Sequence, residues 1–205
     1  MYPPDPYSRN RGFGFGGGMD WKHGYSIWTQ DYPRADRHFN LAVRRLTRID
    51  SRSVEQPVDL DDDDDVFNWP WLYAVQVGRW KLTDSQAAKL REYLDRGGFF
   101  MVDDFWGSDD WEVFERSIRK VYADRPMDDL PRNDQILHTV FDLSDLYQVP
   151  GARYRGSGVT EKCYACPPAW RGMRDPKGRV NVAADRKSTR LNSSHIPLSR
   201  MPSSA

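Results

Sequence analysis

The sequence predicts an α/β fold built on a parallel sheet, and two observations support that prediction. Between residues 72 and 121, apolar runs typical of buried strands alternate with stretches whose apolar residues follow helical spacing. The order is strand, helix, strand, helix, which is typical of strands joined by crossover helices. The run Phe99–Val102 is continuously apolar, as expected for a parallel strand covered on both faces.

The amino-terminal part of this pattern begins after a flexible leader. Residues 1–20 are rich in glycine and proline and hold too little apolar surface to order, so we expect no structure there. Residues 25–28 form a candidate short strand, and Pro33 suits the start of a helix. An amphipathic helix is predicted over 34–48 from apolar residues at helical spacing, namely Phe39, Ala42, Val43, Leu46 and Ile49.

The central strand–helix–strand unit has the clearest signals. Residues 72–77 are predicted to form a buried strand. Thr83 and Gln86 have the spacing of a capping box, which predicts a helix over 84–96 that ends at two glycines. We expect the strands 72–77 and 99–102 to pair in parallel through this helix.

The signals that follow are less regular. A third helix is predicted from the stripe Trp111, Phe114, Ile118 and Val121, with its cap at Ser108 or Asp109. Residues 137–143 fit either a short strand or a turn. Residues 179–184 fit another strand.

The last segment, Asp185–Ala205, resembles a translated sequencing adapter. The string DRKSTRLNSSH matches the codons of a common short-read adapter, and SRMPSSA fits the downstream half of that adapter in the same frame. We therefore exclude this tail from the fold, and we expect the native sequence to be a gene fragment that ends near Ala184. The expected domain spans residues 21–184, and the tail is expected to contribute nothing to its core.

Charge and hydropathy limit the classes of function. The whole chain has 30 basic and 30 acidic residues; the tail carries four basic and one acidic, so residues 1–184 hold 26 basic and 29 acidic, a net charge of −3. This balance argues against nucleic acid as a partner. No apolar run is long enough for a transmembrane segment. A signal peptide, with its basic stretch and apolar core, is not visible near Met1.

Several long motifs resemble a bacterial family known as domain of unknown function 4159 (DUF4159). They are YPRADRHF (32–39), RRLTRIDSRSVEQPVDLDDDD (44–64), FNWPWLYAV (67–75), LTDSQAAKLREYLDRGGFFMVDDF (82–105), YQVPG (147–151) and WRG (170–172). The resemblance implies a flavodoxin-like three-layer sandwich, similar to class I glutamine amidotransferases and truncated here at its carboxyl end. It also implies an exported or periplasmic protein, although it brings no settled activity.

Two aspartates follow the best strand and are the first candidates for chemistry. Asp103 and Asp104 lie where ligands bind in open parallel sheets, at the carboxyl end of a strand. Their carboxylates suit a general base, and the alternative is that one caps a turn while the other faces water. The amidotransferase-like fold carries a cysteine nucleophile at a strand-to-helix elbow, and no cysteine or serine takes a comparable place here.

Other polar groups are weaker candidates. His138, the only histidine in the middle of the domain, suits a general base at the rim of such a site, or a structural hydrogen bond. The aspartate run 61–65 lacks the alternation and turn glycine of a calcium loop, so we expect a solvated loop away from the site. Cys163 and Cys166 fit a local disulfide, free thiols or a metal site; Pro167 and Pro168 oppose a thioredoxin-type helix. No cofactor is predicted.

Two functions remain open from the sequence. The first is a non-catalytic binding or scaffold domain of the bacterial envelope, with an envelope protein as its partner. The second is a hydrolase-like enzyme that uses Asp103, Asp104 and His138, completed by residues beyond Ala184. The lack of a recognisable nucleophile favours the first.

Overall fold

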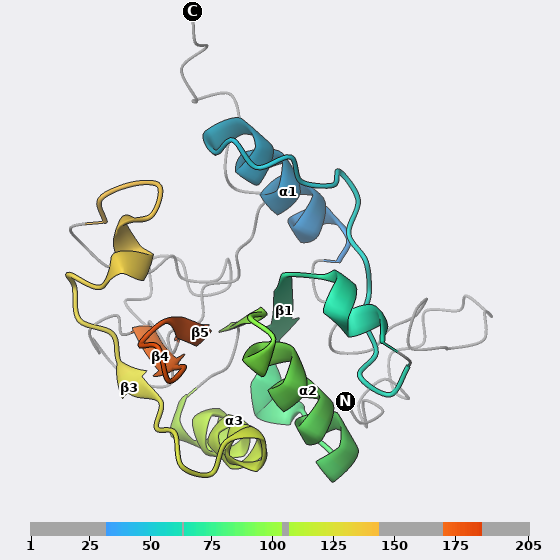
Figure 1. Ribbon diagram of the computed structural model, residues 1–205, viewed down its shortest axis with the longest axis vertical. Coiled ribbons are helices and arrows are strands. Elements are labelled where there is room, and N and C mark those ends of the chain that lie inside the picture. Colours follow the sequence, from blue (N-terminus) through green and yellow to red (C-terminus); the bar gives the residue numbers. More distant parts are fainter. Residues whose placement is uncertain (1–31, 63, 104–106, 144–169, 186–205) are drawn as a thin grey trace, which may run out of the picture.

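The computed structural model describes residues 32–62, 64–103, 107–143 and 170–185 (Figure 1). Several predicted features lie outside this part: the leader, the candidate strand 25–28, Asp104, both cysteines and residues 186–205. Within it the helices are α1 (Arg34–Leu46), α2 (Asp84–Asp95) and α3 (Gly107–Val121), with short 3-10 helices η3 (Asp65–Asn68), η4 (Val77–Arg79) and η5 (Gln135–His138). The strands are β1 (Trp71–Val75), β2 (Phe99–Asp103), β3 (Asp128–Asp129), β4 (Trp170–Arg174) and β5 (Val180–Asp185).

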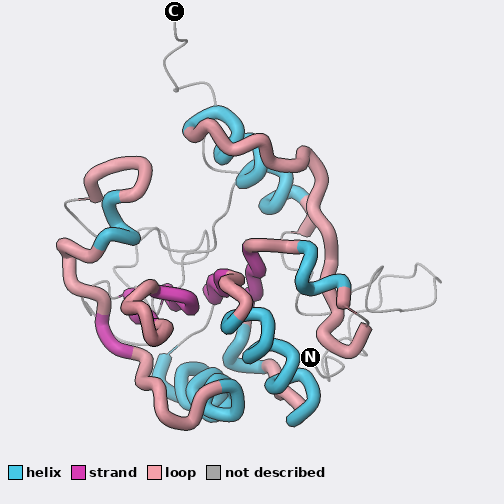
Figure 2. Tube along the Cα trace, in the orientation of Figure 1, coloured by secondary structure: helices cyan, strands magenta, loops and turns pink. Residues whose placement is uncertain are grey.

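The five strands form one mixed sheet in the order β1-β2-β5-β4-β3 (Figure 2). The strands β1, β2 and β5 are parallel, with Tyr73 opposite Met101 and Val102 opposite Ala184. The expected parallel pairing of the two central strands, β1 and β2, is therefore confirmed. The predicted parallel sheet is present in β1, β2 and β5, and the complete sheet is mixed, because β4 is antiparallel to β5 and β3 is antiparallel to β4.

A tight turn explains the antiparallel pairing of β4 and β5. Only residues 175–179 separate the two strands, too few for the crossover that a parallel pair needs. The Asp175 carboxylate accepts hydrogen bonds from the backbone N–H groups of Lys177 and Arg179, each at 2.9 Å. Gly178 has φ of 81°, a left-handed conformation that glycine adopts without steric cost. β5 continues to Asp185, which pairs with Trp170.

The predicted elements of the central unit are present with small changes in their ends. Thr83 and Gln86 form the capping box at the start of α2, with side-chain and backbone hydrogen bonds in both directions. β1 stops at Val75 rather than at Val77, because Gln76 adopts a left-handed conformation with φ of 51° and turns the chain into η4. The α3 helix starts at Gly107, earlier than its predicted cap.

The main core lies between the sheet and the helices α2 and α3, which cover one face (Figure 1). The helices contribute their predicted stripes, and the strands contribute alternate residues such as Phe100 and Val102, as expected for strands with a buried face. Trp80 stacks on Phe100 and Phe114, with ring centroids 5.7 and 5.9 Å apart. We call this part of the molecule the α2–α3 layer.

The α1 helix lies on the other side of the strands in Figure 1. Although its apolar spacing predicted an amphipathic helix, none of its residues is buried. It meets the sheet where the Phe39 ring packs on Trp71, with centroids 4.9 Å apart, and Trp71 in turn packs on Phe99. No helix in the described ranges has the length and apolar character needed to cross a membrane.

The segment 137–143 is not a strand. It begins in η5 and continues as a loop that the Leu143 N–H closes with a hydrogen bond to the Leu137 carbonyl, at 3.2 Å. The turn alternative is therefore correct. Asp134 caps η5 by accepting a hydrogen bond from the Ile136 N–H.

Candidate functional site

Asp103 ends β2 at the carboxyl edge of the parallel strands, as the sequence predicted. Its side chain is buried, with 1 % of the residue exposed. The Tyr73 hydroxyl on the neighbouring strand β1 donates a hydrogen bond to the carboxylate, with an O–O distance of 3.3 Å. The Asp103 carboxylate is thus held inside the fold by another strand rather than turned toward bulk solvent.

The turn after β1 is hydrogen-bonded to the end of β2, at the same carboxyl edge of the sheet as Asp103. The Gln76 N–H donates to the Asp103 carbonyl at 3.0 Å, so the left-handed residue is tied to the end of β2. Gly78, in η4, packs against Asp110 in the first turn of α3, where a Cβ atom would come within 2.3 Å of the Asp110 Cβ. The α3 helix therefore packs closely on η4.

Asp104 follows immediately but lies outside the described residues, so its role stays a prediction. A pair of carboxylates at the strand end was the basis of the hydrolase hypothesis. Of that pair, the structure gives the geometry of Asp103 alone.

His138 is held by its own loop. Its Nε2 atom lies 2.8 Å from the Arg132 carbonyl oxygen, and its Nδ1 atom lies 3.2 Å from Asp142 Oδ1. Both partners only accept hydrogen bonds, so the two contacts together fit the doubly protonated ring. The Arg132 carbonyl, followed by the Asp142 carboxylate, raises the pKa of His138.

His138 and Asp103 come from different parts of the sheet. The η5 helix follows the edge strand β3, and two strands, β5 and β4, separate β3 from β2 in the sheet order. Figure 1 accordingly draws η5 on the β3 side of the molecule. The role of His138 at the rim of a site around Asp103 remains a prediction, and the ring contacts described above are structural.

The start of the acidic run is attached to α2. The Gln86 side chain in the first turn of α2 donates to Asp61, and the Lys89 ammonium donates to the Asp62 carbonyl at 2.7 Å. The position of the run away from a site around Asp103 stays a prediction. Among the described residues, no group of three or more histidine, cysteine, aspartate or glutamate side chains is arranged to hold a metal ion.

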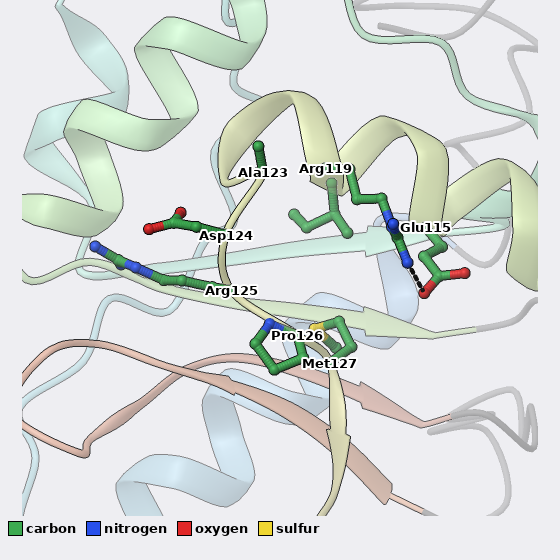
Figure 3. Close-up of a pocket in the computed structure, with 8 residues that line it drawn as sticks. Glu115, Arg119, Ala123, Asp124, Arg125, Pro126 and Met127 are labelled. Atoms are coloured by element: carbon green, nitrogen blue, oxygen red, sulfur yellow. Dashed lines mark hydrogen bonds and ion pairs between the residues drawn. The ribbon is translucent and has the colours of Figure 1, made fainter.

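A shallow hollow of about 260 Å³ lies at the other end of α3 (Figure 3). Arg119 and Glu115 face each other across one side of it and form an ion pair of 3.1 Å. The Arg125 guanidinium points away from the hollow, onto the Tyr122 ring at 3.7 Å. Because Glu115 already neutralises Arg119, the hollow offers little binding energy to a charged ligand.

Two polar side chains of the sheet were not foreseen from the sequence. Tyr73 lies in a predicted strand, but its contact with Asp103 depends on the register of β1 and β2, which the sequence alone does not give. Asn181, in β5, is completely buried, and neither polar atom of its side chain has a hydrogen-bond partner among the described residues. The period of two places Asn181 on the face of Ala183, opposite the α2–α3 layer.

The comparison with protein families agrees with the motifs quoted from the sequence. The model of a family described as Domain of unknown function (DUF4159) matches residues 20–188. This range includes every described element, and its last four residues fall within the segment that we expect to be adapter-derived. A search of curated proteins finds no match. The match covers most of the sequence, and the chain therefore belongs to the DUF4159 family.

Proposed function

We propose that this protein is a non-catalytic binding or scaffold domain of the bacterial cell envelope. The observation that supports this best is that the two candidate catalytic side chains, Asp103 and His138, already make hydrogen bonds within the protein. The Asp103 carboxylate is buried against the Tyr73 hydroxyl, and both nitrogens of His138 are occupied by Arg132 and Asp142. A general base must reach the proton that it removes, and these contacts support structural roles for both groups.

The fold suits such a role. In our proposal the complete domain is a three-layer, flavodoxin-like sandwich similar to class I glutamine amidotransferases, in which loops at the edges present the binding surface. One described loop supports this proposal: Val140, Phe141 and Leu143 follow η5 and are 51 %, 59 % and 44 % exposed. Three neighbouring apolar side chains on a loop are typical of a surface that contacts another protein.

One observation keeps the hydrolase-like enzyme as the second candidate. A carboxylate that is 1 % exposed at the carboxyl end of a central parallel strand is costly to bury and stands where active sites of this fold class lie. Under this alternative Asp103 and Asp104 perform the chemistry and the Tyr73 hydroxyl orients Asp103.

Allelic replacement in the source bacterium separates the two functions. Deletion of the gene defines the phenotype, and Asp103→Asn, Asp104→Asn and His138→Gln are then compared with wild type at equal protein abundance. The scaffold proposal expects all three variants to behave as wild type, because an amide oxygen at position 103 still accepts from the Tyr73 hydroxyl and an amide N–H at position 138 still donates to Arg132 or Asp142. A null phenotype for either aspartate variant, with the protein folded and present in normal amounts, would favour the hydrolase.

The binding role itself is tested at the η5 loop. A photo-cross-linking residue at Phe141 should give a discrete adduct with an envelope protein in living cells, and the same residue at Lys177 in the β4–β5 turn serves as the control. The Phe141→Ser variant should then show the deletion phenotype. Wild-type behaviour of Phe141→Ser would exclude this loop as the binding surface.

A further inference from the structure

The outward face of α1 carries an unusual arrangement of charge. Leu41 lies at its centre, and arginines occupy the positions seven and four residues before it and three and four residues after it. Residues at these spacings share one face of a helix. Arg34, Arg37, Arg44 and Arg45 therefore surround one leucine on a face that extends over about 17 Å, at 1.5 Å per residue.

Most of these arginines have no acidic partner among the described residues. In the part of the chain that the structure describes, Arg37 pairs with Glu55 at 3.0 Å and is still 56 % exposed, whereas Arg34, Arg44 and Arg45 make no ion pair. Arg48, just after the helix, is likewise exposed and without an ion pair there. A positive surface of this kind attracts anionic groups from solution.

The positive charge is concentrated in one segment. Residues 34–52 contain six arginines and two aspartates, although residues 1–184 as a whole have a net charge of −3. Apolar side chains are exposed in the same segment: Leu41 is 40 % exposed, Leu46 41 % and Ile49 61 %. None of the residues of α1 is buried, so the protein leaves this helix available on its outer side.

We propose that α1 docks on an anionic phospholipid surface. The guanidinium groups would bind lipid phosphates, for which their planar donors are well suited, while Leu41, at the centre of the same face, enters the boundary between headgroups and acyl chains. The aliphatic side chain of Leu41 favours lipid over nucleic acid, because sequence-independent binding to single strands relies on aromatic side chains that stack on bases. This inference depends only on the charge and exposure of α1, so it holds whether the domain is a scaffold or an enzyme.

The test uses the full chain and vesicles of defined composition. Flotation compares vesicles of phosphatidylcholine alone with vesicles that also contain phosphatidylglycerol. Wild type should bind the second kind only, and added salt should weaken the binding by screening. Because each basic residue near such a surface contributes roughly fivefold to partitioning, Arg44→Glu with Arg45→Glu should reduce binding by about 25-fold or more. Leu41→Gln should reduce it by a smaller factor.

A matched control changes the same charge elsewhere. Arg116→Glu with Lys177→Glu alters two exposed residues outside α1 and should leave binding unchanged. If the first double variant folds poorly, as circular dichroism would reveal, Arg34→Glu with Arg48→Glu makes the same test at the start of the face and just after the helix. Equal loss in the α1 and control variants, no binding of wild type to phosphatidylglycerol vesicles, or tighter arginine-dependent binding to duplex DNA would each overturn the proposal.

Discussion

The helices of the α2–α3 layer and the α1 helix all have apolar residues at helical spacing. They differ in whether those residues are buried. The α2 and α3 helices bury their apolar stripes against the sheet, so that Leu94 and Phe114 are at most 1 % exposed. The α1 helix has an equally regular stripe and no buried residue, and it meets the sheet through Phe39 and Trp71. The difference shows that one region forms the stable core while the other remains a surface element.

The largest expected effect comes from the same truncation made in both regions. Leu94→Ala in α2 should lower the free energy of unfolding by about 2–5 kcal/mol, because it leaves a cavity in a packed core. Leu46→Ala in α1 should cost less than about 1 kcal/mol, since that leucine is already 41 % exposed. Urea denaturation of the two variants measures both values, and similar costs would remove the distinction between the regions.

A second comparison concerns the packing of α3 on η4. Gly78→Ala should destabilise the protein by about 1–3 kcal/mol, because the added methyl would overlap Asp110 at 2.3 Å and force α3 away. Asn40→Ala in α1 is the control and should change stability by less than about 0.5 kcal/mol. Thermal denaturation distinguishes the two, and a neutral Gly78→Ala would show that α3 can shift freely.

The face opposite the α2–α3 layer contains a buried polar side chain, Asn181, that has no hydrogen-bond partner in the part of the chain that the structure describes. Replacement of the buried Asn181 by the similarly sized Leu should raise the free energy of unfolding by about 1–2 kcal/mol, because an unpaired amide in an apolar setting is costly. Urea denaturation checks this. A loss of stability on this substitution would mean that the amide has a partner in solution.

The smallest expected effect is the pH dependence of the η5 loop. The pKa of His138 is raised in the folded protein, so its contribution to stability is complete below the unfolded value of about 6.5 and is lost as pH rises through the folded value. Amide exchange at Leu143, corrected for the intrinsic rate, should therefore accelerate above that range. His138→Gln should remove the pH dependence, and an unchanged profile in that variant would contradict the contacts of the ring.

The sequence was sufficient for the elements that depend on local signals and insufficient for those that depend on pairing. The capping box of Thr83 and Gln86 and the stripes of α2 and α3 were predicted because their residues lie within one element. The strands β3 and β4 were missed, because two to five residues carry little periodicity of their own. The contact of Tyr73 with Asp103 and the exposure of α1 both depend on how distant elements meet.

The same limit applies to the candidate site. Asp103 was found because a carboxylate after a buried parallel strand is a local pattern, and its burial was not foreseen. His138 was chosen by residue type, and only the structure shows that Arg132 and Asp142 hold its ring. Residue type and position therefore indicate which side chains could perform chemistry. Only the structure shows which of these side chains are held by hydrogen bonds to other residues.

The most direct test of the central claim, that α1 is a surface element outside the stable core, is native-state hydrogen exchange followed residue by residue. We expect amides in α2, α3 and β2 to exchange only through global unfolding, with protection equal to the full stability of the protein. Amides in α1 should exchange through local opening, with clearly lower protection, and phosphatidylglycerol vesicles should raise that protection. Equal protection of α1 and α3 in the free protein would contradict the account.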